Sequence, residues 1–115
     1  MRPILPSLRE KNRYIVYNIK SDKKLKFREI MEAVENTHLR FLGELETAKA
    51  GVRIMDHFYQ NQGIVKVHSK YVDKSRVALM LLKKVQGKDV IVQTVGVSGT
   101  LKRAKSKFFN QGGGL

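Results

Sequence analysis

The sequence predicts an α+β fold of the ferredoxin-like type, a βαββαβ antiparallel sheet followed by an extra C-terminal basic helix. Segments in which apolar residues alternate, as in strands, are interspersed with two segments in which they recur every three or four residues, as in helices. The 115 residues include no cysteine and are 42% hydrophobic, so one core can form without disulfides. We expect a single α/β sandwich domain over residues 13–109, after an extended basic arm over residues 1–12 and before a disordered tail over residues 110–115.

The first strand is expected over residues 13–19, because β-branched and aromatic residues alternate between two faces there. A helix follows, capped by Ser21 or Asp22 and stopped by Gly43, and residues 44–50 can add a short helical turn. Its apolar residues recur at helical spacing: Phe27, Ile30, Met31, Val34, His38, Phe41 and Leu42. Its outer face carries four charged residues: Arg28, Glu29, Glu32 and Glu35.

A β-hairpin is expected next, with strands over residues 52–59 and 64–68 joined by a polar connection that contains glycine. Residues 69–85 have helical spacing, and one apolar stripe contains Tyr71, Ser75, Ala78, Leu79 and Leu82, widened by Val77, Met80 and Leu81. Residues 90–97 are β-branched nearly throughout, which is typical of a strand that is covered on both faces or central in its sheet. The closing helix places three apolar residues on one face: Leu101, Ala104 and Phe108.

In this arrangement two helices pack on one face of a four-stranded sheet. The opposite face is left for a ligand, a protein partner or the C-terminal helix. RNA-recognition modules, metabolite-sensing domains and small enzymes all share this plan. The fold class alone therefore decides no function.

The charge of the chain indicates a polyanionic partner. There are 23 basic and 10 acidic residues, which give a formal net charge of +13. Residues 1–28 and 63–115 are basic whereas residues 29–62 are acidic, so the cationic surface comes mainly from the two ends of the chain. Because such an excess of charge repels itself in isolation, nucleic acid is the leading partner. No apolar run approaches the roughly 18 residues of a membrane span, so we expect no membrane partner and a cytoplasmic location.

The histidines do not suggest catalysis, and the sequence predicts neither a catalytic residue nor a metal site in this chain. Asp56 and His57 are neighbours on a strand and face opposite ways. His38 lies on an apolar stripe, where a hydrogen-bonded core histidine is more common than a ligand. His68 ends its strand, where a surface role or a hydrogen bond to RNA is more plausible than acid–base chemistry. No phosphate-binding glycine loop or nucleophile motif is present.

Charge rather than base stacking is expected to support RNA binding. The strand over residues 64–68 lacks the two aromatic residues of RNA-recognition modules, so Tyr14 and Tyr17 are expected to pack in the core or under the C-terminal helix. A turn over residues 98–100 opens the basic helix, and free amides at a helix N-terminus favour phosphate. The alternative is a capped helix with a solvated basic face. The predicted RNA-binding residues are Arg2, Arg9, Lys11, Arg13, Ser98, Gly99, Thr100, Lys102, Arg103, Lys105 and Lys107.

Four segments of the chain carry a resemblance to a known family. They are Arg2–Lys11 leading into Arg13–Ile15, Leu42–Leu45 with Ala48 and Ala50, Gly63–Val67 followed by Tyr71 and Val72, and Val97–Lys102. In this order and spacing they resemble archaeal ribonuclease P protein component 2 over nearly the whole chain. His68 stands where many relatives are expected to have a different residue, so the resemblance assigns its side chain no role.

The resemblance implies an RNA-recognition-like core in a ribonucleoprotein that removes 5′ leaders from precursor tRNA. The RNA subunit is the catalyst of this endoribonuclease, so the protein chain breaks no bond and binds no cofactor, and magnesium is expected on the catalytic RNA. The implied partners are ribonuclease P RNA with its precursor tRNA, and protein component 3, in a heterotetramer with two copies of each protein. Another RNA-binding subunit, for example ribosomal, and a small-molecule-sensing domain of the same fold are the alternatives. Only phosphate recognition would weaken steeply as ionic strength rises, which separates the last alternative from the others.

Overall fold

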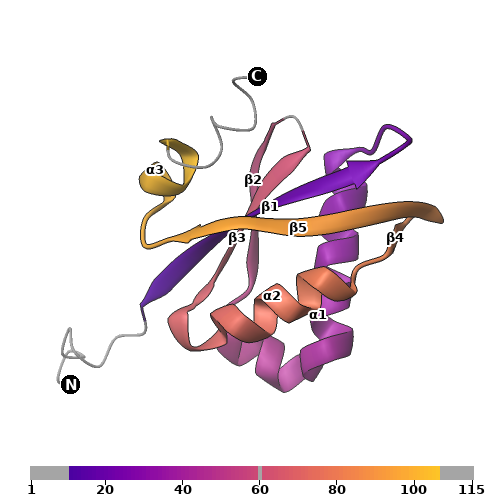
Figure 1. Cartoon of the computed structure of the whole chain (residues 1–115). Helices are drawn as coiled ribbons and strands as arrows, with labels where there is room; N and C mark the ends of the chain where they lie inside the picture. The colour runs from indigo at the N-terminus through magenta and orange to yellow at the C-terminus, as the bar shows by residue number, and fades with distance from the viewer. Residues whose placement is uncertain (1–10, 60, 107–115) are drawn as a thin grey trace, which may run out of the picture.

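The computed structural model describes residues 11–59 and 61–106, apart from the side chains of residues 56–59 (Figure 1). Its elements in order are β1 (Asn12–Ser21), α1 (Phe27–Ala50), β2 (Arg53–Tyr59), β3 (Gln62–His68), the 3-10 turn η2 (Ser69–Tyr71), α2 (Val72–Leu81), β4 (Lys84–Val85), β5 (Lys88–Ser98) and α3 (Leu101–Ala104). This order confirms the predicted βαββαβ succession with a closing helix, and it adds the short strand β4. Most of the predicted arm and the whole predicted tail lie outside the described residues.

The strands form one antiparallel sheet in the order β2-β3-β1-β5-β4. The central strand, β1, pairs with β3 along Asn12–Asn18 and with β5 along Tyr14–Ser21. The register with β5 shifts between Val16 and Tyr17, which marks a β-bulge in the ladder. Because β1 has a long partner on each side, it holds the two halves of the sheet together.

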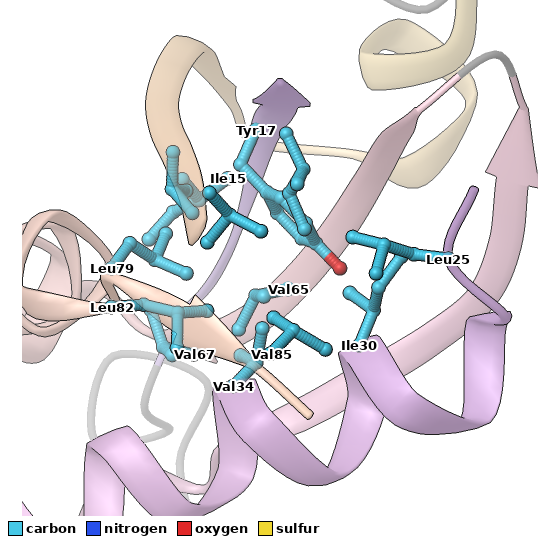
Figure 2. Packing of buried hydrophobic residues seen from close by; sticks show 13 residues of the cluster. Ile15, Tyr17, Leu25, Ile30, Val34, Val65, Val67, Leu79, Leu82 and Val85 are labelled. Atoms are coloured by element: carbon cyan, nitrogen blue, oxygen red, sulfur yellow. The ribbon is translucent and has the colours of Figure 1, made fainter. Parts of the chain in front are cut away.

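The two faces of the sheet are covered by different elements (Figure 1). On the face of α1 and α2, alternate residues of β1 and β3 enter the main core: Ile15, Tyr17, Ile19, Val65 and Val67. Figure 2 shows these strands meeting side chains from α1 and from the end of α2, among them Ile30, Val34, Leu79 and Leu82. On the opposite face α3 joins a smaller apolar cluster: Val16, Ile64 and Ala104 with Tyr14, Met55 and Leu101. The predicted alternation of β1 is confirmed, since Tyr17 packs in the core and Tyr14 packs in the cluster that contains α3.

The start of α1 differs from the prediction. The helix begins at Phe27, and its first turn is closed by Glu29, whose Oε1 accepts a hydrogen bond of 3.0 Å from the Lys26 amide. Ser21 still belongs to β1, where it pairs with Val90, so neither Ser21 nor Asp22 can cap the helix. The intervening residues form the turn between strand and helix.

Gly43 interrupts α1 without ending the helical segment. Its φ of 82° is left-handed, and the chain then resumes a helix that continues to Ala50 and ends at Gly51, which has a φ of 61°. The predicted short helical turn over residues 44–50 is thus confirmed. The prediction that Phe41 lies on the buried stripe is wrong: beside this kink its side chain is 43% exposed.

The second helix is shorter than predicted. It ends at Leu81, and Lys84–Val85 form β4, which pairs with Lys88–Asp89 across a turn of two residues with positive φ. The predicted stripe is confirmed at its buried members: Ser75, Ala78, Leu79 and Leu82. Its predicted widening is wrong, because the side chains at these positions stay exposed: Val77 (42%), Met80 (62%) and Leu81 (52%).

The last long strand, β5, is neither central nor covered on both faces. Along one edge it pairs with β1 over most of its length, but along the other edge β4 pairs with only its first two residues. Val90 and Val92 are buried toward the helices, whereas Ile91 on the other face is 61% exposed. A β-branched run is therefore compatible with a strand that has one open face.

His38 links α1 to α2 through both ring nitrogens. Nδ1 lies 2.8 Å from the Val34 carbonyl and therefore carries the proton, so Nε2 accepts a hydrogen bond of 2.6 Å from the Ser75 hydroxyl. The side chain is fully buried. Burial lowers the pKa of His38, although the bond to the Val34 carbonyl opposes that shift. The prediction of a hydrogen-bonded core histidine is confirmed.

Tyr17 requires a glycine opposite it. Tyr17 pairs directly with Gly63 of β3, and a Cβ atom at Gly63 would overlap the phenol ring and its hydroxyl. That hydroxyl is buried and has no hydrogen-bond partner within the described part of the chain, and burial raises the pKa of Tyr17. The largest side chain of the core thus lies across the backbone of the neighbouring strand.

This packing predicts opposite effects of two small changes. Gly63→Ala should lower the free energy of unfolding by about 1–3 kcal/mol, because the added methyl overpacks the site. Tyr17→Phe should leave it unchanged or raise it, because removing an unpaired buried hydroxyl costs no hydrogen bond. Urea unfolding followed by circular dichroism measures both. A Tyr17→Phe loss as large as that of Gly63→Ala would contradict the account.

The buried His38 predicts a loss of stability on acidification. Its pKa is lower in the folded chain than the ordinary value near 6.5, so the unfolded chain binds a proton first as the pH falls. The stabilisation is complete above about pH 6.5 and should decline below it by at most ~1.4 kcal/mol per pH unit. Comparing urea unfolding of the wild type and His38→Gln from pH 7.5 to 5 isolates this contribution. A difference in the free energy of unfolding between wild type and variant that stays constant over this pH range would contradict the prediction.

Candidate nucleic-acid interface

The start of β1 and the end of β5 bring two basic segments together. Tyr14 pairs with Ser98 in the antiparallel ladder, so the residues before one and after the other lie side by side. A Cβ atom at Gly99 would lie 3.9 Å from the Arg13 guanidinium Nη1. The antiparallel pairing of β1 and β5 thus places Arg13 beside the turn that leads into α3.

The turn before α3 is held by its own hydroxyl groups. The Ser98 hydroxyl donates to the Thr100 carbonyl at 3.1 Å and accepts from the Thr100 amide at 3.4 Å. Thr100 Oγ1 caps the helix by accepting a hydrogen bond of 3.2 Å from the Arg103 amide. The Arg103 and Thr100 amides are therefore already paired within the turn and are not free to bind a phosphate. The roles of Ser98, Gly99 and Thr100 in binding RNA stay predictions.

The side chains of α3 divide into an apolar set that faces the sheet and a basic set that faces outward, as their spacing predicts. Leu101 and Ala104 face the sheet, whereas Lys102 and Arg103 are exposed and Lys105 is half-buried. Lys11 is exposed and Arg13 half-buried at the start of β1, where the Arg13 guanidinium also donates to the Asn12 carbonyl at 2.9 Å. Four predicted contact or packing residues lie outside the described part: Arg2, Arg9, Lys107 and Phe108. The structure therefore places Arg13 beside the turn that leads into α3, with Lys11 just before it in the chain.

Acidic residues collect on a different surface. Glu32 and Glu35 are exposed on α1, which covers the opposite face of the sheet from α3 (Figure 1). Glu29, which closes the first turn of α1, is half-buried. The sheet therefore separates Glu32 and Glu35 on α1 from the cations around α3, although the helix side also carries exposed Arg40 and Arg76.

Two cations that sequence reasoning did not select also lie on the face of α3. Arg53 of β2 and Lys66 of β3 are directly opposite each other, and Lys66 is directly opposite Tyr14 of β1. Strand alternation was the available signal, because Lys66 lies two residues after Ile64 and so shares its face. The pairing of Arg53 with Lys66 needs the register of the hairpin, which the sequence pattern leaves undetermined.

The histidines form no shared site in the described residues. His38 is used in the core, the side chains of Asp56 and His57 lie outside the description, and the His68 ring packs against Gly51, where a Cβ atom would lie 2.5 Å from Nε2. Over the described ranges, no group of three or more histidine, cysteine or carboxylate side chains could hold a metal ion. Within the same ranges no helix is long and apolar enough to cross a membrane.

Sequence comparisons place the chain among proteins of one kind. The sequence model of the Rpp14/Pop5 family matches residues 13–109. Ribonuclease P protein component 2 of Pyrococcus abyssi is 41% identical over 114 residues, which cover 98% of this chain and 97% of the relative. The protein of the same name from Archaeoglobus fulgidus is 40% identical, with 94% and 97% covered. That of Methanosarcina mazei is 32% identical, with 98% and 97% covered.

The fold recurs in a solved ribonucleoprotein. A chain in the cryo-EM structure of yeast Ribonuclease MRP superimposes with a TM-score of 0.63, covering 80% of this chain and 76% of that chain. The two sequences are 14% identical, so the similarity is one of fold.

Proposed function

This chain belongs to the Rpp14/Pop5 family, and from that premise we propose that it is protein component 2 of an archaeal ribonuclease P, acting in the cytoplasm. In this role it is an RNA-binding subunit of the ribonucleoprotein that removes 5′ leaders from precursor tRNA. The observation that supports RNA binding most directly is the meeting of Arg13 with the turn before α3. This proximity supports a cationic region that includes Arg13 and the exposed Lys102 and Arg103 of α3.

The proposed mechanism is electrostatic. Exposed Lys11, Lys102 and Arg103 neutralise phosphates of the ribonuclease P RNA, which lets closely packed RNA segments approach each other. The catalytic RNA then folds at a lower magnesium concentration, and the magnesium ions bind the RNA rather than this chain. Bond cleavage takes place in the RNA, with the precursor tRNA as substrate, and this chain supplies no catalytic group.

We propose protein component 3 as the direct protein partner, in a heterotetramer with two copies of each. The surface that suits it lies on α1 and α2, where Phe41 is 43% exposed and Leu81 52% exposed. Together with Thr37 and Arg40 these side chains line a hollow of about 330 Å³. The exposed carboxylates of Glu32 and Glu35 on the same helix disfavour RNA there, whereas an apolar hollow with a polar rim is typical of a protein interface.

The cations of α3 predict a specific change in salt dependence. A variant with Gln at positions 102, 103, 105 and 107 should bind ribonuclease P RNA more weakly, with a flatter slope of log K against log salt concentration. Each lost phosphate contact should reduce the slope by roughly 0.7–0.9, and RNAs of unrelated sequence should be affected alike. Filter binding across a salt series measures this effect. Circular dichroism checks that the variant is folded.

A control variant with Gln in place of four exposed cations elsewhere, Lys23, Lys24, Arg76 and Lys83, loses the same net charge. Its slope should stay close to that of the wild type. Equal slopes for both variants would instead assign RNA binding to the N-terminal arm or to net charge alone. If the wild type binds RNA without any salt dependence, the proposed electrostatic mechanism is wrong.

The hollow on α1 and α2 predicts a separable loss of protein binding. Phe41→Ser with Leu81→Ser should weaken binding to component 3 at least tenfold while leaving RNA affinity unchanged, because the apolar side chains at the centre of an interface contribute most of its energy. Ile91→Ser serves as the control, since Ile91 is 61% exposed on the opposite face of the sheet. Isothermal titration with purified component 3 measures the affinity. Equal weakening by the control variant would place the interface elsewhere.

A further inference from the structure

A row of polar and charged side chains crosses the face of the sheet on which α3 lies. In the strand register Arg53 of β2 lies opposite Lys66 of β3, Lys66 opposite Tyr14 of β1, and Tyr14 opposite Ser98 of β5. Four residues from four strands therefore lie next to one another in a line across the sheet. The line ends at the turn that leads into α3.

The apolar cluster beneath α3 borders this row. Two residues further along three of the strands, on the same face, are Met55, Ile64 and Val16, and all three belong to the cluster that contains Ala104 of α3. The row thus lies beside α3, and Arg53 remains exposed while Lys66 is half-buried. A ligand that reaches Lys102 and Arg103 on α3 would come to Lys66 and Arg53 by passing over Tyr14, which itself packs in the cluster.

The pair of Arg53 and Lys66 is unfavourable by itself. Residues directly opposite on antiparallel strands have Cβ atoms about 4.5–5.5 Å apart, and like charges on such a pair of residues destabilise the sheet. Within the described residues neither side chain forms an ion pair, and the ion pair found there is Lys84 with Asp89 on the β4–β5 hairpin. The repulsion therefore has no counter-charge among the described side chains.

We propose that Arg53 and Lys66 together bind a backbone phosphate of an RNA strand that passes from α3 across the open end of the sheet. The guanidinium offers two parallel N–H donors to a phosphate, and the lysine ammonium supplies a second charge from the neighbouring strand. A phosphate between them replaces repulsion with two attractions. This inference rests on the proposed RNA-binding function, and it adds a contact on the sheet to the contacts of α3 and the N-terminal end.

RNA fits this surface better than an acidic protein does. Protein interfaces have an apolar centre, but the exposed large apolar side chains of the described chain lie on α1, α2 and the middle of β5: Leu39, Phe41, Leu45, Val77, Met80, Leu81, Ile91 and Val95. The end of the sheet that holds Arg53 and Lys66 offers these two charges and the half-buried Tyr14 instead. This composition suits a polymer that presents phosphates.

Two variants and a control test the inference. Arg53→Gln with Lys66→Gln removes the pair, Arg53→Glu places a carboxylate opposite Lys66, and Lys23→Gln with Lys24→Gln removes two exposed charges in the β1–α1 turn. Stability is measured as the thermal midpoint at low ionic strength, with and without inorganic phosphate. RNA binding is measured with ribonuclease P RNA over a salt series, using the full-length protein.

Without phosphate, both pair variants should have a higher thermal midpoint than the wild type, because the repulsion between Arg53 and Lys66 is gone. Inorganic phosphate should raise the thermal midpoint of the variants less than it raises that of the wild type. Both should also bind RNA several-fold more weakly. Their slope of log K against log salt concentration should be flatter by roughly 0.7–0.9 for the one lost phosphate contact. A variant that gains stability while it loses affinity cannot owe the loss to misfolding. The control should change neither its stability nor its phosphate response in this way.

The remaining outcomes separate this inference from the proposed function. If the wild type binds RNA and the pair variants bind like the control, the site on the sheet is wrong while the RNA-binding function stands. If the pair variants keep their RNA affinity but lose binding to component 3, the row is a protein contact and the inference is overturned. If the wild type itself fails to bind RNA, the proposed function fails first.

Discussion

The pairing of β1 with a long strand on each side is the interaction on which the rest of the structure depends. Because successive side chains of a strand point to opposite faces, β1 gives Ile15, Tyr17 and Ile19 to the main core and Tyr14 and Val16 to the cluster beneath α3. A slip of one residue would exchange the two sets and expose the core. Both hydrophobic clusters, and with them the positions of all three helices, depend on this single register.

The same pairing explains how the charge is arranged. Antiparallel pairing brings the start of β1 to the end of β5, so the basic residues of two distant segments share one end of the sheet. The acidic side chains Glu32 and Glu35 are carried by α1 on the opposite side. In a chain with a net charge of +13, the cations beside α3 thus lie on one side of the sheet, while the exposed apolar side chains Phe41, Met80 and Leu81 lie on the helices that cover the other.

Polar groups inside the core differ in how well they are paired. His38 uses both ring nitrogens to tie α1 to α2, so its burial costs little at neutral pH. The Tyr17 hydroxyl has no partner among the described atoms, yet the ring fills the space above Gly63 and contributes a large buried area. The two residues show why the core tolerates polar side chains only where geometry supplies a partner or where the apolar part of the side chain outweighs its polar tip.

The sequence by itself determined the order of elements, the two faces of β1, the buried stripe from Ile30 to His38 and the basic closing helix, because these follow from local periodicity. It also indicated a polyanionic partner, because net charge needs no fold. Only the tertiary structure decided that Ser21 stays in β1, that the second helix ends at Leu81 and that Phe41 is exposed, since pairing partners and kinks are properties of distant contacts. The meeting of Arg13 with Gly99 and of Arg53 with Lys66 has the same origin: strand register joins residues that no local pattern relates.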